Sequence, residues 1–235
     1  MTPASDDPRI KRGMATQLAA RRARLSAGES PLGWKVGFGS PAAMDTLGTT
    51  APLVGFLMQR GVVASDGVVS LTGWVKPVAE PEIAVHIGRD LPAGGELSAA
   101  AAAIAALSPA IELADAALPL ADVEAILASN IFQRHVVLGR HDAARAGGTV
   151  AGLTGRIIRR GREYARVTDP EEATGNLIDI VRHVADTLGA FGEQLRAGEI
   201  IIAGSVVAPL IIEPDEDGVT FELDPIGGVS VRFTH

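Results

Sequence analysis

One carboxylate interrupts an apolar stretch in the middle of the chain. Residues 109–114 read Pro-Ala-Ile-Glu-Leu-Ala, and this run of mostly apolar residues predicts a buried strand. An ionised carboxylate is expensive to bury unless a cation, a proton or hydrogen bonds accompany it. Whatever fold the chain adopts must therefore bring a partner to Glu112.

A second acidic motif lies earlier in the sequence. Glu80 and Glu82 open an alternating strand predicted over residues 80–87, and residues two apart on a strand point to the same face. Two such carboxylates repel each other unless a cation or a proton lies between them. Two interpretations stay open: solvated acids at a strand edge, or, together with Glu112, a site for a hard cation such as Mg²⁺ or Mn²⁺. Spacing alone does not show that the three glutamates converge.

Lysine is scarce in this chain, with only Lys11, Lys35 and Lys76 among 21 basic residues. A lysine can titrate and transfer a proton where an arginine cannot. Lys35 lies in Gly-Trp-Lys-Val-Gly (33–37), a predicted strand whose glycines permit close approach of a ligand. Partial burial there is expected to lower its pKa toward neutrality; the alternative is a surface lysine lying over Trp34. Lys76 precedes the acidic pair and is a candidate ion-pair partner for it.

Composition excludes several other classes. The chain has no cysteine, so disulfides, thiolate metal sites and cysteine nucleophiles are absent. A net charge of −7 argues against a nucleic-acid partner or an anionic membrane surface. No apolar run is long enough to span a membrane. The N-terminal residues lack the apolar segment of a secretory signal, and a cytoplasmic protein is expected.

Many short strands with a few helices predict an α+β fold. We expect an N-terminal helical arm over residues 1–32 and a single domain over residues 33–235. The expected helices cover residues 6–27, 41–47, 98–107, 120–128 and 176–196; the expected strands cover 33–38, 53–57, 68–71, 80–87, 109–114, 131–139, 148–153, 156–160, 163–167, 200–207, 219–223 and 228–233.

A series of motifs in fixed order carries a family resemblance. They are GWKVGF (33–38), EPEIAV (80–85), PAIELAD (109–115), VVLG (136–139), LGAFGEQLRAGEIIIAGS (188–205) and IGGVSVRF (226–233). Together they resemble the 2-keto-4-pentenoate hydratase / 4-oxalocrotonate decarboxylase branch of the fumarylacetoacetate hydrolase superfamily. The resemblance implies a mixed β-roll, a small 2-oxo acid substrate and a homo-oligomer.

The resemblance also assigns roles to residues. It implies that Glu80, Glu82 and Glu112 hold Mg²⁺ or Mn²⁺, which chelates the C1 carboxylate and C2 oxygen of the substrate and stabilises its enolate. Lys35 matches the family's lysine, a candidate proton shuttle. The candidate substrate contacts are Ser205, Lys76 and Asn130.

This chain departs from the family pattern at the groups that would activate water. The acidic loop of the family reads Gly-Thr-Thr-Ala-Pro-Leu-Val-Gly here (48–55), and Asp115 is followed by two alanines where Ser-Arg is common. The segment 127–129, before Asn130, also lacks the aspartate often found there. These losses weaken a hydratase assignment and leave metal-assisted enolate chemistry in place.

The expected function is a divalent-metal-dependent lyase that adds water to a 2-hydroxypentadienoate-type substrate through a metal-bound dienolate. The first alternative is decarboxylation of a 4-oxalocrotonate-type diacid through the same species. The second is a homologue that binds metal and a 2-oxo acid without turnover. A purely structural role remains if the three glutamates do not converge.

Overall fold

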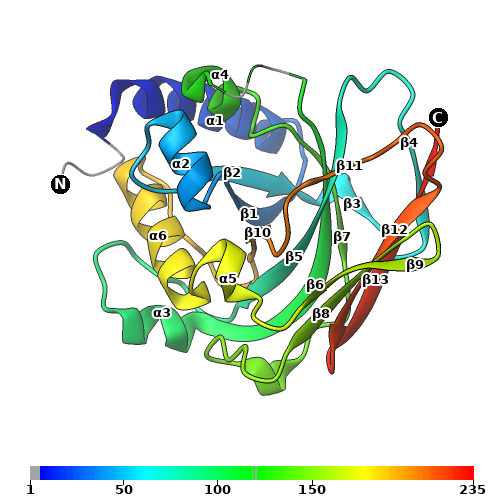
Figure 1. The fold of residues 1–235 in the computed structure, drawn as a ribbon. Coiled ribbons are helices and arrows are strands. Elements are labelled where there is room, and N and C mark those ends of the chain that lie inside the picture. The colour runs from blue at the N-terminus through cyan, green and yellow to red at the C-terminus, as the bar shows by residue number, and fades with distance from the viewer. Residues whose placement is uncertain (1–5, 118, 120) are drawn as a thin grey trace.

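Short strands outnumber helices along the chain, and the strands form two sheets of eight and five members. The computed structural model describes residues 6–117, 119 and 121–235. Figure 1 shows the larger sheet strongly curled, with helices on one side of it and the smaller sheet on the other. The expected α+β class and curled, mixed sheet are therefore confirmed.

The larger sheet carries the predicted acidic strands at its centre. Its order is β2-β1-β10-β5-β6-β7-β3, with β11 beside β5. The pairs β1–β10 and β3–β7 are parallel and the other pairs are antiparallel, so the sheet is mixed. Its strands are β1 (Pro31–Gly37), β2 (Leu53–Met58), β3 (Val62–Val63), β5 (Pro77–Ile87), β6 (Ile104–Asp115), β7 (Gln133–Leu138), β10 (Ile200–Ser205) and β11 (Leu210–Ile211).

The smaller sheet packs against one end of β6 and β7 through β12 and β13. Its order is β4-β13-β12-β8-β9, and its alternating strands bury apolar residues such as Phe221 and Val231 on one face. Its strands are β4 (Gly67–Ser70), β8 (Thr154–Arg159), β9 (Arg162–Val167), β12 (Gly218–Asp224) and β13 (Gly227–Thr234).

The helices begin at the caps that the sequence offers. Asp7 caps the first helix by accepting from the Arg9 amide, and Ser40 caps the second by accepting from the Ala43 amide. The first helix, α1, packs along α4, and α3 packs against α6. The helices are α1 (Pro8–Ser26), α2 (Pro41–Leu47), α3 (Leu97–Ala103), α4 (Val123–Ala128), α5 (Glu171–Thr174) and α6 (Leu177–Ala190), with 3-10 turns η2 (Gln59–Gly61) and η3 (Ala143–Arg145).

Several expected elements and boundaries are wrong. The strand expected over residues 200–207 ends at Ser205, and the strand expected over 80–87 begins at Pro77. The alanine-rich helix stops at Ala103, because residues 104–107 pair with β5 as the start of β6. Residues 148–153 form turns, since Gly148 and Gly152 take positive φ of 81° and 76°. Residues 131–132 belong to a left-handed turn and not to β7. Helix α6 ends at Ala190, close to Gly192 at φ 76°. The expected helix start at residue 120 lies outside the described residues.

The two faces of the larger sheet have different roles. Trp34 faces α1, where the Arg21 guanidinium lies 4.6 Å from its ring centroid. Lys35, next in the strand, points to the opposite face. Register puts Lys35 beside Ile202 of β10, and Ile202 beside Ala84 of β5. This second face carries a small apolar cluster of Leu32, Leu57, Ala84, Ala110, Val136, Ile200 and Ile202.

Within the described residues no helix is long and apolar enough to cross a membrane. The division into an arm over residues 1–32 and a domain over 33–235 stays a prediction, and residues 1–5 of that arm lie outside the described part.

Candidate metal centre

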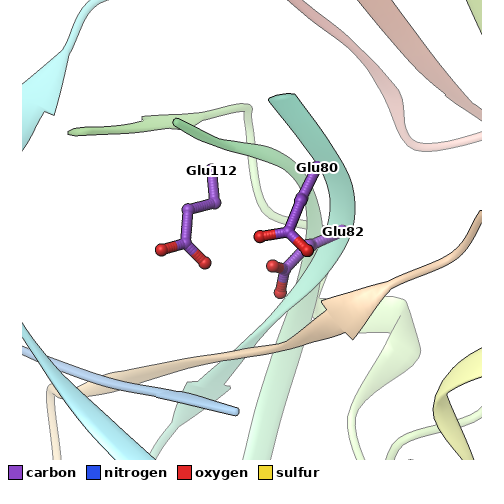
Figure 2. Close-up of side chains that lie close together, drawn as sticks. All are labelled: Glu80, Glu82 and Glu112. Carbon is purple, nitrogen blue, oxygen red and sulfur yellow. The ribbon is translucent and has the colours of Figure 1, made fainter. Parts of the chain in front are cut away.

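Three carboxylates converge on the second face of the larger sheet. Glu80 and Glu82 extend from β5 and Glu112 from β6, and one oxygen of each lies within 4.8 Å of the others (Figure 2). Glu80 and Glu112 are direct cross-strand partners. Glu82 and Glu112 are buried and Glu80 is partly exposed. The convergence that spacing alone left open is therefore present.

The carboxylates are electrostatically strained in this arrangement. Burial raises the pKa of Glu112 to about 7, against the opposing attraction of Lys35 and with added repulsion from Glu80. Burial, followed by repulsion from Glu112 and Glu80, holds the pKa of Glu82 well above its usual value. Burial also raises the pKa of Glu80, while Lys35 opposes the shift. The cluster therefore favours additional positive charge among its oxygens.

Lys35 supplies part of that charge. Its side chain is 2% exposed, and its ammonium forms an ion pair with Glu112 and donates to the Ile131 carbonyl at 3.2 Å. Burial alone would lower the pKa of Lys35, but attraction to the three carboxylates outweighs burial and raises it. The predicted fall of the Lys35 pKa toward neutrality is therefore wrong. The prediction did not include attraction to three carboxylates, because the sequence alone did not show that they converge.

The end of β10 lies beside Glu82. The Gly204 amide donates to Glu82 Oε2 at 2.7 Å, and Ser205 is the cross-strand partner of Glu82. The Ser205 hydroxyl lies 3.4 Å from the Pro81 carbonyl, to which it donates. The structure thus brings Ser205 to the cluster. The Gly204 amide is a further site group, and the only sequence signal for it is the Gly-Ser pair that ends the buried strand.

Two other expected site residues have different surroundings. Both polar ends of the Asn130 amide are bonded to Phe56: Oδ1 accepts from its amide at 2.8 Å and Nδ2 donates to its carbonyl at 2.9 Å. Lys76 has an exposed side chain before β5, and its backbone amide donates to Asp115. Among the described residues Lys76 forms no ion pair with the acidic pair.

The donor set fits a hard divalent cation. Three carboxylate oxygens within 4.8 Å of one another lie close enough that small side-chain shifts would bring them around one ion that binds oxygen at roughly 2.0–2.1 Å. Glu112 Oε2 is buried with no hydrogen-bond partner among the described residues. A buried, unpartnered carboxylate oxygen is costly, and a cation at that point would remove the cost.

Asp115 does not take the place of the acids that the family pattern has and this chain lacks. Asp115 Oδ1 accepts from the Val75 and Lys76 amides at 3.0 and 2.8 Å, and Oδ2 lies 3.3 Å from the Arg134 guanidinium. This carboxylate therefore fixes the segment that enters β5. Residues 48–55 contain no aspartate or glutamate, so this loop supplies no acid either.

Comparison with known proteins shows similar sequences over most of the chain. A 2-hydroxyhexa-2,4-dienoate hydratase of Comamonas testosteroni is 28% identical, over 91% of this chain and 82% of its own length. A 4-oxalocrotonate decarboxylase of Pseudomonas putida is 27% identical, over 92% of this chain and 83% of its own length. No family model matches the chain.

A solved structure shows the same fold. The 4-oxalocrotonate decarboxylase of Pseudomonas putida G7, complexed with magnesium and adipate, superposes with a TM-score of 0.85 at 26% identity, over 93% of this chain and 83% of that chain. The curled sheet that carries the carboxylate cluster therefore has the fold of this magnesium-complexed decarboxylase. The chain is similar over most of its length to 2-keto-4-pentenoate hydratases and 4-oxalocrotonate decarboxylases, which confirms the resemblance found in the sequence.

Proposed function

We propose that the chain is a divalent-metal-dependent lyase that adds water to a small 2-oxo-enoate of the 2-hydroxypentadienoate type. The observation that carries the proposal is the convergence of Glu80, Glu82 and Glu112, of which Glu112 has a buried Oε2 with no hydrogen-bond partner in the described part of the chain. The relatives named as hydratases and decarboxylases, and the magnesium in one solved neighbour, support an enzyme over a binding protein.

The three glutamates would hold Mg²⁺ or Mn²⁺. When bound, such a cation supplies a Lewis acid that stabilises negative charge on the oxygens of a 2-oxo acid. The Gly204 amide holds Glu82 in place through its hydrogen bond to Oε2. The apolar residues that share this face, including Ala84 and Ile202, limit water around the cluster and so strengthen its electrostatics.

Lys35 is the proton-carrying group of the proposal. Its Nζ is held by Glu112 and by the Ile131 carbonyl, both within hydrogen-bond reach. In the charge arrangement of the structure Nζ is protonated, because its pKa is raised, and it is a donor toward a carbon of the substrate. Ser205 is the proposed contact to the substrate from β10.

A second reaction is favoured by the same site. Water addition needs a group that presents water, and residues 48–55 contain no acid while Asp115 is bonded to backbone amides. Decarboxylation of a 2-oxo diacid uses the same stabilisation of an enolate and needs no activated water. Release of CO₂ from a 4-oxalocrotonate-type substrate is therefore the alternative to water addition.

Thermal unfolding with Mg²⁺ or Mn²⁺ and oxalate, a mimic of a bidentate 2-oxo acid, tests the site. At about 100 times the dissociation constant the ligand adds roughly 2.7 kcal/mol, a rise of about 5–10 °C for a chain of this size. We expect the rise in wild type and in Glu96→Gln, an exposed control, and its loss in Glu112→Gln. No rise in wild type would overturn the metal site and the enzyme with it.

The two reactions are then separated by product. Loss of the dienoate absorbance with a hydroxylated product supports water addition, and CO₂ release from the diacid supports decarboxylation. A metal-dependent rise in stability with neither product, from either substrate, would identify a binding homologue without turnover.

A further inference from the structure

Three consecutive residues beside the site have a backbone that residues with side chains rarely adopt. Asn130, Ile131 and Phe132 have φ of 57°, 51° and 64°, in the left-handed region. A β-branched residue such as Ile131 is disfavoured there. Such a run persists only where its surroundings enforce it, and sites of this kind are often functional.

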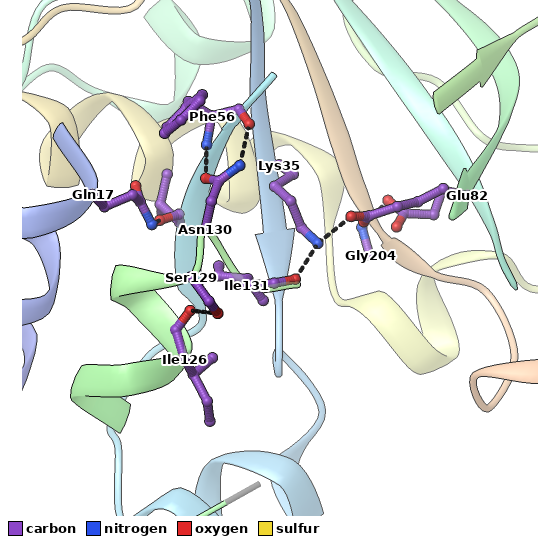
Figure 3. A network of polar contacts seen from close by, with 11 residues as sticks. Gln17, Lys35, Phe56, Glu82, Ile126, Ser129, Asn130, Ile131 and Gly204 are labelled. Atoms are coloured by element: carbon purple, nitrogen blue, oxygen red, sulfur yellow. Dashed lines mark hydrogen bonds and ion pairs between the residues drawn. The ribbon is translucent and has the colours of Figure 1, made fainter. Parts of the chain in front are cut away.

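The Asn130 side chain restrains this turn. Its amide bonds both the amide and the carbonyl of Phe56 in β2, so it takes the place of a strand partner (Figure 3). At the other end, the Ile131 amide donates to the Ile126 carbonyl at 2.8 Å and closes α4. The turn is thus fastened between β2 and α4.

Two glycines give the turn its space. A Cβ at Gly55 would lie 2.9 Å from Lys35 Cγ and 3.0 Å from Asn130 Oδ1. A Cβ at Gly37 would lie 2.9 Å from Ile131 Cγ2. The turn therefore lies directly against β1 and β2, at the point where the Lys35 side chain leaves its strand.

This arrangement points the Ile131 carbonyl at the Lys35 ammonium. The Ile131 carbonyl accepts from Lys35 Nζ at 3.2 Å, and Glu112 holds the same ammonium from β6. We propose that Asn130 is a positioning residue: it fixes the left-handed turn so that the Ile131 carbonyl sets the place of Lys35 Nζ. The proposal rests on the proposed function only in taking Lys35 as the group that moves a proton.

This role differs from the substrate contact expected from sequence. Both polar ends of the Asn130 side chain are already bonded to Phe56, and Asn130 is 9% exposed. One Nδ2 hydrogen and one Oδ1 lone pair of this amide are thus committed to the Phe56 backbone, which fixes the orientation of the side chain. The influence of Asn130 on the reaction passes through Ile131 and Lys35.

The variant Asn130→Gly separates the side chain from the backbone, because glycine accepts positive φ without strain and removes only the two bonds to Phe56. The matched control is Asn176→Gly, at the other asparagine of the chain. Asn176 caps α6 by accepting from the Ile178 amide, so this variant costs stability without touching the turn.

Amine labelling followed by peptide mass spectrometry measures how accessible the Lys35 amine is, and so whether it is still held in its buried position. The chain has three lysines, and Lys11 and Lys76 are exposed, so both are internal standards for the buried Lys35. In Asn130→Gly we expect labelling of Lys35, relative to these two, to rise about tenfold. In Asn176→Gly the ratio stays within about twofold of wild type. An unchanged ratio in Asn130→Gly, or an equal rise in both variants, would overturn the proposal.

Kinetics give the second readout. We expect Asn130→Gly to lower kcat about tenfold or more, with KM and the half-saturating Mg²⁺ concentration nearly unchanged. A rise in KM at constant kcat would instead make Asn130 a substrate contact. If the wild type turns over neither substrate, the proposed function fails, and the labelling ratio still decides whether Asn130 positions Lys35.

Discussion

Glu80 and Glu112 lie directly opposite each other across β5 and β6, with Glu82 on the same face two residues further along β5. Like charges in a cross-strand pair are destabilising. Lys35 offsets part of this repulsion, yet the pKa of Glu112 remains raised to about 7. A sheet centre that keeps three acids and one ammonium together supports the proposed divalent-cation site.

The raised pKa of Glu112 makes stability depend on pH in the metal-free protein. The folded state binds this proton more tightly than the unfolded state, so stability falls as pH rises from the usual value of 4.5 through about 7. Glu112→Gln removes this dependence. We expect the free energy of unfolding of Glu112→Gln, minus that of wild type, to grow from pH 5 to 7, by at most about 1.4 kcal/mol per pH unit. Urea unfolding at several pH values measures it.

Taking the difference between variant and wild type removes an opposing contribution. Burial, with a smaller effect of His141, lowers the pKa of His86 to about 4, so His86 contributes stability above its usual pKa that is lost as pH falls. Both proteins share this contribution. A difference that stays flat between pH 5 and 8 would show that Glu112 is not strained.

Lys35→Met tests the proton-carrying role. Methionine fills the buried volume but has no ammonium, so the site keeps its three carboxylates and loses its donor. We expect turnover to fall at least about 100-fold, the scale of acid–base catalysis, while Mg²⁺ still raises the melting temperature. Lys11→Met, at an exposed position, is the control and should retain full turnover. Turnover of Lys35→Met near that of wild type would exclude the role.

Gly55→Ala tests the space shared by Lys35 and Asn130. Its Cβ would approach both residues to about 3 Å, so one of them must move. We expect a loss of about 1–3 kcal/mol in stability, the usual cost of overpacking, and a larger loss of turnover than stability alone explains. Gly48→Ala is the control: φ is 60° there, so alanine is strained, but apart from its chain neighbours no described residue has an atom within 4 Å of the added Cβ. Equal effects of both variants on turnover would contradict the prediction.

Gln17→Ala tests how α1 stabilises β2 and α4, the two elements that hold the turn at Asn130. Gln17 is fully buried, and Nε2 donates to the Val54 carbonyl at 3.2 Å and to the Leu127 carbonyl at 3.0 Å. Its loss leaves two buried carbonyls without this donor, at a cost of about 1–3 kcal/mol. Thr16→Ala, on the exposed side of α1, should cost less than about 0.5 kcal/mol. Urea unfolding compares the two.

Much of the fold follows from local patterns. Alternation predicted β5, and strands expected over residues 219–223 and 228–233 lie within β12 and β13. Ser40 and Asn176 cap α2 and α6 in the structure. The alanine-rich segment shows the limit of this reasoning. Residues 104–107 favour a helix by composition, but pairing with β5 makes them a strand, because cross-strand contacts outweigh a weak local propensity.

The sequence by itself determined that Glu112 needs a partner, that Glu80 and Glu82 share a face, and that the chain resembles a metal-dependent branch of a known superfamily. Only the tertiary structure decided that the three acids meet, that Lys35 is held as an ammonium among them, and that Asn130 bonds to Phe56. The physical reason is that the face on which a strand residue lies, and its propensity for helix or strand, are local properties of the sequence. Register between β5 and β6, and the closure of the turn at Asn130 onto β2, depend on contacts between residues far apart in the chain.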